Sequence, residues 1–179
     1  MSRRAVTETV TRKRVPTTVT IGHHPLHPIL IVFPIALLFT ALGSDLLYWW
    51  TGDPFFARGS LWLIGAGAAG AAVAAVTGFI DFATVRYTRE QISSWSHMLA
   101  GITTLSLATA NFLTRYADPA GSVLPLGLLL SLDTAVMLIC TGWLGGNLTF
   151  RHLIGSYLEE EEAKTLDAIK AASPKPETQ

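Results

Sequence analysis

Cysteine and charge are both scarce in this sequence. The 179 residues include one cysteine, Cys140, which excludes a disulfide within the chain and a cysteine-based metal site. Charged residues make up 15% of the chain, whereas soluble domains carry roughly 25%. The formal net charge is zero, so nothing indicates a nucleic-acid partner. Half of the residues are hydrophobic, which favours a membrane protein over a soluble one.

Four long apolar runs account for this hydrophobicity. Each is close to the ~20 residues that a helix needs to cross ~30 Å of hydrocarbon. The runs cover residues 28–50, 60–82, 95–116 and 124–148. Tryptophan and tyrosine lie toward the ends of the runs, as in an interfacial aromatic belt. The sequence therefore predicts an all-α integral membrane four-helix bundle within residues 22–150, surrounded by the lipid bilayer.

Basic residues are distributed unequally between the two sides of the predicted spans. The segments before the first run, between the second and third runs, and after the fourth run contain 11 of the 13 lysines and arginines. The positive-inside rule therefore places both termini and the middle loop in the cytoplasm. We expect a multi-pass protein of the cell's inner (plasma) membrane.

The two ends of the chain have a different composition from the spans. Residues 1–21 form a basic segment without periodicity, and residues 173–179 are polar and proline-rich, so both are expected to be disordered. Residues 151–172 are predicted to form a cytoplasmic helix, in which Glu160 and Lys164 make a favourable i, i+4 pair.

The histidines are the most informative residues because the predicted topology brings all of them to the cytoplasmic side. They are His23, His24, His27, His97 and His152. His27 and His97 begin spans that run in the same direction, so the two share a depth in the membrane. His97 lies one turn into an apolar helix, where an ionisable side chain is a candidate functional residue.

Two kinds of site are compatible with histidines at one depth. Two histidines from facing helices can hold a haem iron from both sides. Alternatively, three or four histidine and aspartate ligands could hold a zinc or iron ion. For either site the candidate ligands are His97, His27 and His152, and His24 is a weaker candidate. In the haem interpretation His97 pairs with either His27 or His152.

Other residues at this depth would support such a site. Asp81 ends the second run and could orient a histidine ring, while Arg86 and Arg151 could contact haem propionates. The arginines are equally well explained as positive-inside anchors on anionic lipid. Residues 65–72 are almost free of bulky side chains, which permits close helix packing or leaves a slot for a flat macrocycle.

Two short motifs carry a resemblance to a known family. Residues 24–28 read His-Pro-Leu-His-Pro, and residues 33–35 read Phe-Pro-Ile. Together with Asp45 they resemble a bacterial family of predicted four-span membrane proteins of unknown function, over about residues 22–150. Val32 stands where many members have a further histidine, so one possible ligand is missing. Some relatives are fused to Rieske iron–sulfur domains, which implies membrane electron transfer.

The sequence thus predicts a haem b, cytochrome b-like protein that exchanges electrons with a quinone or a partner redox protein. Two alternatives stay open: an accessory subunit of a larger membrane complex with merely interfacial histidines, and a divalent-metal-binding membrane protein. Whether the chain is an enzyme is left undecided. Asp133 lies deep in the fourth run, where it could relay protons or contact a quinone, but the favoured interpretation is a hydrogen bond across helices to a neighbour such as Ser44 or Asn111.

Overall fold

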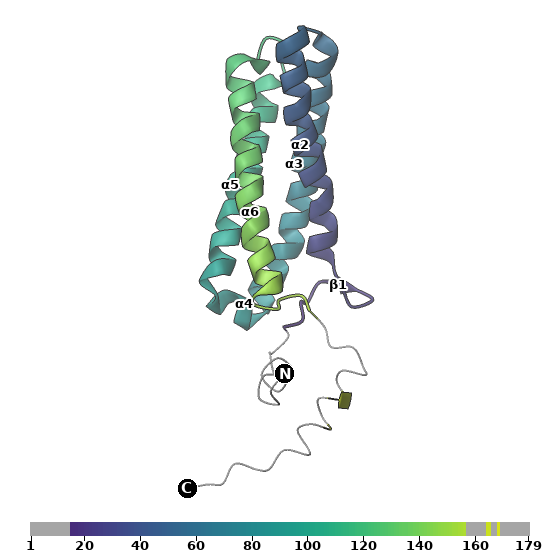
Figure 1. Cartoon of the computed structure of the whole chain (residues 1–179), viewed down its shortest axis with the longest axis vertical. Coiled ribbons are helices and arrows are strands. Elements are labelled where there is room, and N and C mark those ends of the chain that lie inside the picture. Colours follow the sequence, from purple (N-terminus) through teal and green to yellow (C-terminus); the bar gives the residue numbers. More distant parts are fainter. Residues whose placement is uncertain (1–14, 157–163, 166–167, 169–179) are drawn as a thin grey trace, which may run out of the picture.

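The computed structural model describes residues 15–156 together with residues 164, 165 and 168. Four long helices form an antiparallel bundle (Figure 1). They are α2 (Leu26–Thr51), α3 (Pro54–Thr84), α5 (Ile92–Arg115) and α6 (Leu128–Phe150). Shorter elements connect or precede them: the strands β1 (Thr20–Ile21) and β2 (His24–Pro25), the helical turn α4 (Arg86–Glu90), and the π-helical turn η1 (Val123–Gly127).

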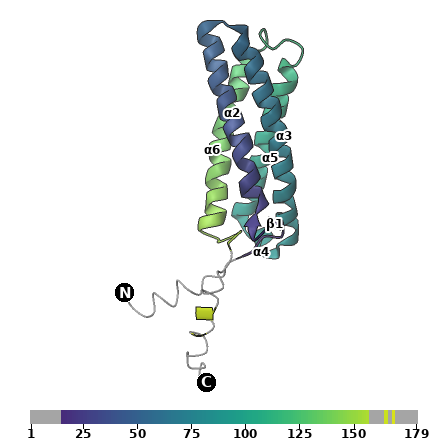
Figure 2. The same cartoon turned by 90° about the vertical axis from the view of Figure 1, so that its right-hand side faces the viewer.

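The bundle is built from two helical hairpins, α2–α3 and α5–α6. Helix α3 packs against α5, and α2 packs against α6, so the order around the bundle is α2, α3, α5, α6 (Figures 1 and 2). Helices α2 and α5 therefore lie on one diagonal, and α3 and α6 on the other. The members of each diagonal pair run in the same direction.

A tight connection between α2 and α3 fixes the first hairpin. Gly52 adopts the left-handed conformation, with φ of 70°, and its N–H donates to the carbonyl of Tyr48, which closes α2. The side chain of Asp53 accepts a hydrogen bond from the N–H of Phe55, and Pro54 occupies the first position of α3. The Gly-Asp-Pro sequence thus ends one helix and begins the next.

All four predicted spans are long helices, but they differ in apolarity. Among the described residues, three segments are long and apolar enough to cross a membrane: α2, α3, and η1 together with α6 (Val123–Phe150). Helix α5 has 24 residues, and its many serines and threonines lower its hydropathy. An all-α membrane protein is therefore supported, while a fourth span remains a prediction.

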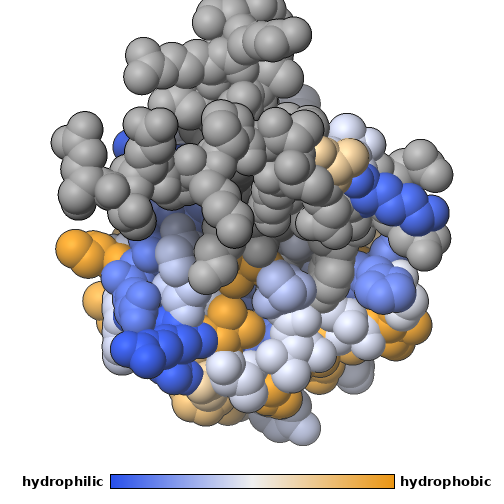
Figure 3. Space-filling model, turned by 90° about the horizontal axis from the view of Figure 1, so that it is seen from below, coloured by the Kyte–Doolittle hydropathy of each residue, from blue (hydrophilic) through white to orange (hydrophobic). Residues whose placement is uncertain are grey.

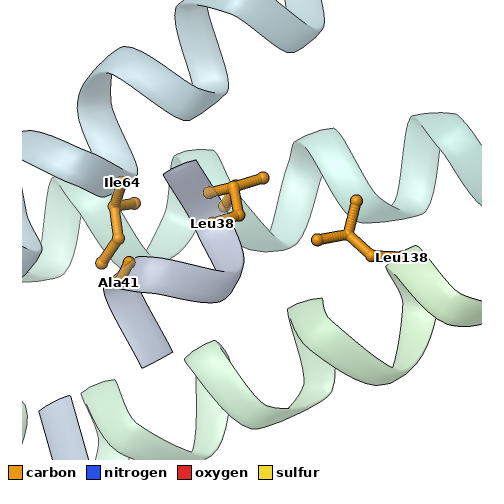
Figure 4. Close-up of a cluster of buried hydrophobic side chains, with 5 residues drawn as sticks. Leu38, Ala41, Ile64 and Leu138 are labelled. Atoms are coloured by element: carbon orange, nitrogen blue, oxygen red, sulfur yellow. The ribbon is translucent and has the colours of Figure 1, made fainter. Parts of the chain in front are cut away.

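One cluster of the apolar core joins the four long helices. All four long helices contribute to a cluster of five buried residues (Figure 4): Leu38, Ala41, Ile64, Ala108 and Leu138. Close approach of α2 and α3 depends on Gly67, because a Cβ there would lie 2.8 Å from Cδ2 of Leu38. Such small residues matter in a membrane, where packing rather than transfer from water holds helices together.

The outward faces of the bundle are largely apolar. Exposed side chains include Trp62, Val76, Leu99, Val136 and Ile139. Viewed from below, hydrophilic residues gather at the end of the bundle, and apolar residues lie toward its sides (Figure 3). This pattern is the one expected for helices that contact lipid.

The segments that flank the bundle meet beneath one end of it. The N–H of Val15 donates to the carbonyl of Leu153 at 3.1 Å, and the N–H of Gly155 donates to the carbonyl of Val15 at 2.8 Å. Residues 15–21, within the segment expected to be disordered, therefore hold backbone hydrogen bonds and a strand. Residues 151–156 form a turn and a bridge instead of the start of a helix. Most of the predicted helix 151–172 and tail 173–179 lies outside the described residues.

Candidate functional site

Two of the five histidines lie together where α2 and α5 begin. His27 is in the first turn of α2, and His97 is in the second turn of α5. Their ring centroids are 6.0 Å apart and the ring planes are nearly perpendicular, at 89°. Both side chains are partly buried. We call these residues the histidine pair, and this end of the bundle the histidine end.

A backbone carbonyl of the neighbouring helix fixes each ring of the histidine pair. The Nδ1 atom of His27 lies 2.7 Å from the carbonyl oxygen of Ala74, and Nδ1 of His97 lies 3.0 Å from that of Thr141. A carbonyl can only accept, so each Nδ1 carries a proton and donates it. In a neutral ring Nε2 then keeps its lone pair. Among the described residues, no hydrogen bond reaches Nε2 of either ring.

Glycine makes room for both rings in the same way. The accepting carbonyls of Ala74 and Thr141 each lie four residues before a glycine, Gly78 or Gly145. A Cβ at Gly78 would lie 2.8 Å from Nδ1 of His27, and one at Gly145 would lie 3.0 Å from Cε1 of His97. Any side chain at either position would displace the ring. Both hairpins therefore hold the histidine in the same way, with a carbonyl that accepts from Nδ1 and a glycine four residues later that leaves room for the ring.

The other three histidines do not join the pair. His24 is exposed in β2, where it is paired with Ile21 in the strand register. His23 has a φ of 65° in the turn between the two strands. His152 is partly buried just after α6, and its N–H donates to the carbonyl of Asn147. In the described part of the chain, no ring contact joins His152 to the histidine pair.

Among the described residues, none of the predicted supporting side chains makes a hydrogen bond to a ring of the histidine pair. Asp81 is buried, and its Oδ1 accepts the backbone N–H groups of residues 18 and 19, each at 2.8 Å. It therefore anchors the segment before α2, whereas the sequence predicted that it would orient a histidine. Arg86 is exposed and pairs with Glu90 at 2.9 Å. Arg151 is exposed as well.

A buried ion pair occupies the opposite end of the bundle. Nη1 of Arg115 lies 2.6 Å from Oδ1 of Asp45, and Nη2 lies 2.8 Å from Oδ2. This two-pronged geometry is the strong form of an arginine–carboxylate interaction. Both side chains are fully buried. We call this end the ion-pair end.

Three polar side chains complete this interaction and satisfy its remaining groups. Asn111 accepts from Nε of Arg115 at 2.7 Å, and Ser60 accepts from Nη1 at 3.1 Å. Ser131 accepts from Nη2 at 3.2 Å and donates to Asp45 at 2.6 Å. The network therefore joins all four long helices.

Sequence reasoning missed this network. It counted Arg115 only as one of two basic residues on the outer side, and it named Asn111 as one candidate hydrogen-bond partner of Asp133. One signal was available: Asp45 follows His27 by 18 residues, and Arg115 follows His97 by the same 18. Because 18 residues make about five helical turns, the two residues of each helix share a face. Each hairpin thus begins with a histidine and places one charge five turns later.

The arrangement defines a helical membrane protein made of two similar hairpins, with apolar outer faces and three helices able to cross a bilayer. The chain belongs to the family described as "Predicted membrane protein (DUF2231)", whose model matches residues 23–157. That range runs from the histidine-proline motif to the segment after α6. No curated protein and no solved structure matches the chain.

Proposed function

We propose that this protein is a cytochrome b-like membrane protein in which His27 and His97 are the axial ligands of a haem b. The observation that carries the proposal is the geometry of the histidine pair. Residues from diagonal helices place two imidazole rings at one level, and hydrogen bonds at Nδ1 leave both Nε2 atoms available.

The separation of the rings suits one iron between them. A metal–imidazole bond is about 2.0 Å long, and the ring centre lies about 1.1 Å behind the bonded nitrogen. Two rings on opposite sides of one iron then have centres about 6.2 Å apart. In the structure the ring centroids are 6.0 Å apart. Each ring plane must contain its metal–nitrogen bond, but the angle between the planes is free, so 89° is compatible with this role.

The number of available ligands favours haem over a bare divalent ion. A porphyrin supplies four nitrogens, so two histidines complete the coordination. A zinc site needs three or four protein ligands. Among the residues that the structure describes, no group of three histidine, cysteine, aspartate or glutamate side chains is placed to hold a metal ion.

Small residues next to the histidine pair support the fit of a flat group. Gly101 lies one turn after His97, and a Cβ added there would meet no atom within 4 Å. Gly142, about one turn before Gly145 on α6, is exposed, and a Cβ there would also meet no atom within 4 Å. Arg86 and Arg151 are exposed near this end, and we assign them to the propionates.

Haem iron between two imidazoles supplies one-electron chemistry, cycling between ferric and ferrous. The chain's contribution is to hold both rings and to raise their ligand strength through the bonds from Nδ1 to backbone carbonyls. We place this centre near the cytoplasmic face of a four-span inner-membrane protein with both termini inside. A quinone or a partner redox protein would donate and accept the electron.

The test is a reduced-minus-oxidised visible spectrum of the full chain purified in detergent from its native membrane. We expect a b-type signal that His27→Ala and His97→Ala each abolish. His24→Ala and His152→Ala are matched controls that keep the signal, and circular dichroism checks that each variant is folded. A folded wild type without the signal would refute the proposal. If His152→Ala lost the signal and His27→Ala kept it, His152 would take the place of His27 as the second haem ligand.

A further inference from the structure

The charged side chains of the four long helices fall into two groups. They are Asp45, Arg58, Asp81, Arg115 and Asp133. Asp45, Asp81 and Arg115 are buried and hydrogen-bonded. Arg58 and Asp133 are exposed. Neither takes part in an ion pair or a side-chain hydrogen bond with any described residue. The two unpaired charges are of opposite sign.

The ion-pair end fixes the positions of Arg58 and Asp133 relative to each other. Ser60 and Ser131 both bind the guanidinium of Arg115, so they lie at one level of the bundle. Arg58 is two residues before Ser60, and Asp133 is two residues after Ser131. Two residues rotate a helix by about 200°. Because the serines point inward, both charged side chains point away from the bundle.

Arg58 and Asp133 cannot pair within one chain. Helices α3 and α6 are diagonal partners, so their outward faces point to opposite sides of the bundle (Figure 1). In two neighbouring copies, Arg58 of one copy and Asp133 of the other can come close enough to pair. Both helices run in the same direction, and the two residues differ in depth by four positions, or about 6 Å. That offset is within the reach of an arginine side chain.

A charge on this surface needs a partner. Both α3 and the Val123–Phe150 segment are apolar enough to cross a membrane. Asp133 lies beyond the level of Ser131, toward the middle of its helix. Charged residues inside membrane spans are costly, and they almost always face the protein interior or pair with another charge. The chain itself supplies the complementary charge on its opposite side.

We propose that copies of this chain associate head to tail in the membrane, with Asp133 on α6 of one copy against Arg58 on α3 of the next. Such a heterologous contact can repeat, so it builds a ring or a row and does not stop at a two-fold dimer. The proposal rests on the two lipid-facing charges and does not depend on the histidine pair or on haem.

The sole cysteine offers a direct test of the interface. Cys140 lies nine residues after Ser131, and Ala69 lies nine residues after Ser60. Nine residues make about two and a half turns, so both positions lie at matching depth on outward faces. Both are exposed. The head-to-tail contact therefore brings Cys140 of one copy opposite Ala69 of the next.

The experiment oxidises full-length Ala69→Cys in native membranes and separates the products on a non-reducing gel. We expect dimers and a ladder of larger species. Wild type, with Cys140 alone, should stay monomeric. The matched control is Ser106→Cys, which adds a thiol at an exposed position of α5 and should also stay monomeric. The proposal would be overturned if Ala69→Cys formed no more cross-links than Ser106→Cys. Efficient cross-linking of the wild type would also overturn it, because two Cys140 residues can meet only if α6 of one copy faces α6 of the next.

Charge exchange tests whether the ion pair holds the contact. In the Ala69→Cys background, Arg58→Glu and Asp133→Lys should each reduce the linked fraction about tenfold, which corresponds to ~1.4 kcal/mol. The combined exchange, Arg58→Glu with Asp133→Lys, should restore the ladder. Membrane-inserted single variants that link as well as their parent would refute the pairing. So would a combined variant that inserts but does not link.

Discussion

Asp45→Asn tests the ion-pair end most directly. The substitution keeps the shape of the side chain and removes its charge. The guanidinium of Arg115 then stays fully buried without a counter-charge, at the centre of contacts from all four long helices. Removing one partner of a buried pair costs about 3–5 kcal/mol, because the remaining charge is uncompensated. Exposed pairs are worth about 0–1 kcal/mol.

We expect a loss near the lower bound, about 3 kcal/mol, because oxygens of Ser60, Asn111 and Ser131 still accept from Arg115. The combined variant Asp45→Leu, Arg115→Met should recover at least half of that loss, since apolar replacement of a whole buried pair is often neutral. The measurement is equilibrium unfolding in mixed detergent micelles, followed by circular dichroism.

Asp53→Asn is the matched control for this experiment. Asp53 is exposed and caps α3, and asparagine is an equally good capping residue, so its stability should change little. A loss below about 1 kcal/mol for Asp45→Asn would refute the reasoning, because the pair would then behave like a surface salt bridge. A combined variant less stable than Asp45→Asn would show that the loss of stability comes from the surrounding polar groups and not from the uncompensated charge of Arg115.

Three further predictions concern single contacts. Gly78→Ala should displace His27, destabilise the fold by about 1–3 kcal/mol and weaken the proposed haem spectrum, because its Cβ would lie 2.8 Å from Nδ1. Gly43→Ala, which meets nothing within 4 Å, should instead stabilise α2 by up to about 1 kcal/mol in the same unfolding measurement. Asp81→Ala should leave the backbone N–H groups of residues 18 and 19 without their acceptor, at a local cost of about 1–3 kcal/mol. Hydrogen exchange at these two residues should therefore accelerate. Unchanged exchange would contradict the role of Asp81 as an anchor of the segment before α2.

The helices were predictable because their signal is long and local. Runs of about 20 apolar residues leave few alternatives to a membrane helix, and the Gly-Asp-Pro and Asp-Pro-Ala-Gly turns mark where hairpins close. The proximity of His27 and His97 also followed, since helices that start on one side bring their first residues to one depth. Within the described residues, helix α5 is not among the three helices apolar enough to cross a membrane, because its serines and threonines reduce its hydropathy.

The ion-pair network was not predictable by the same route. Counting basic residues treats Arg115 only as a cation of the outer side, because it lies at the end of an apolar run. Only the fold shows that it is fully buried against Asp45, 70 residues away. The hydrogen bonds of Asp81 were not predictable for a related reason: its partners are backbone N–H groups of a segment with no periodicity, and backbone donors leave no trace in a sequence pattern.

The two ends of the bundle depend on each other through the helices that join them. Each hairpin contributes one histidine and one charge, so neither hairpin alone completes either pair. A rise of about 1.5 Å per residue makes the 18-residue spacing about 27 Å in both α2 and α5. When Asp45 meets Arg115, the two equal lengths bring His27 level with His97. The ion pair therefore sets the axial register of the diagonal helices, and we expect that Asp45→Asn shifts the midpoint potential of a haem at the histidine pair without removing either ligand.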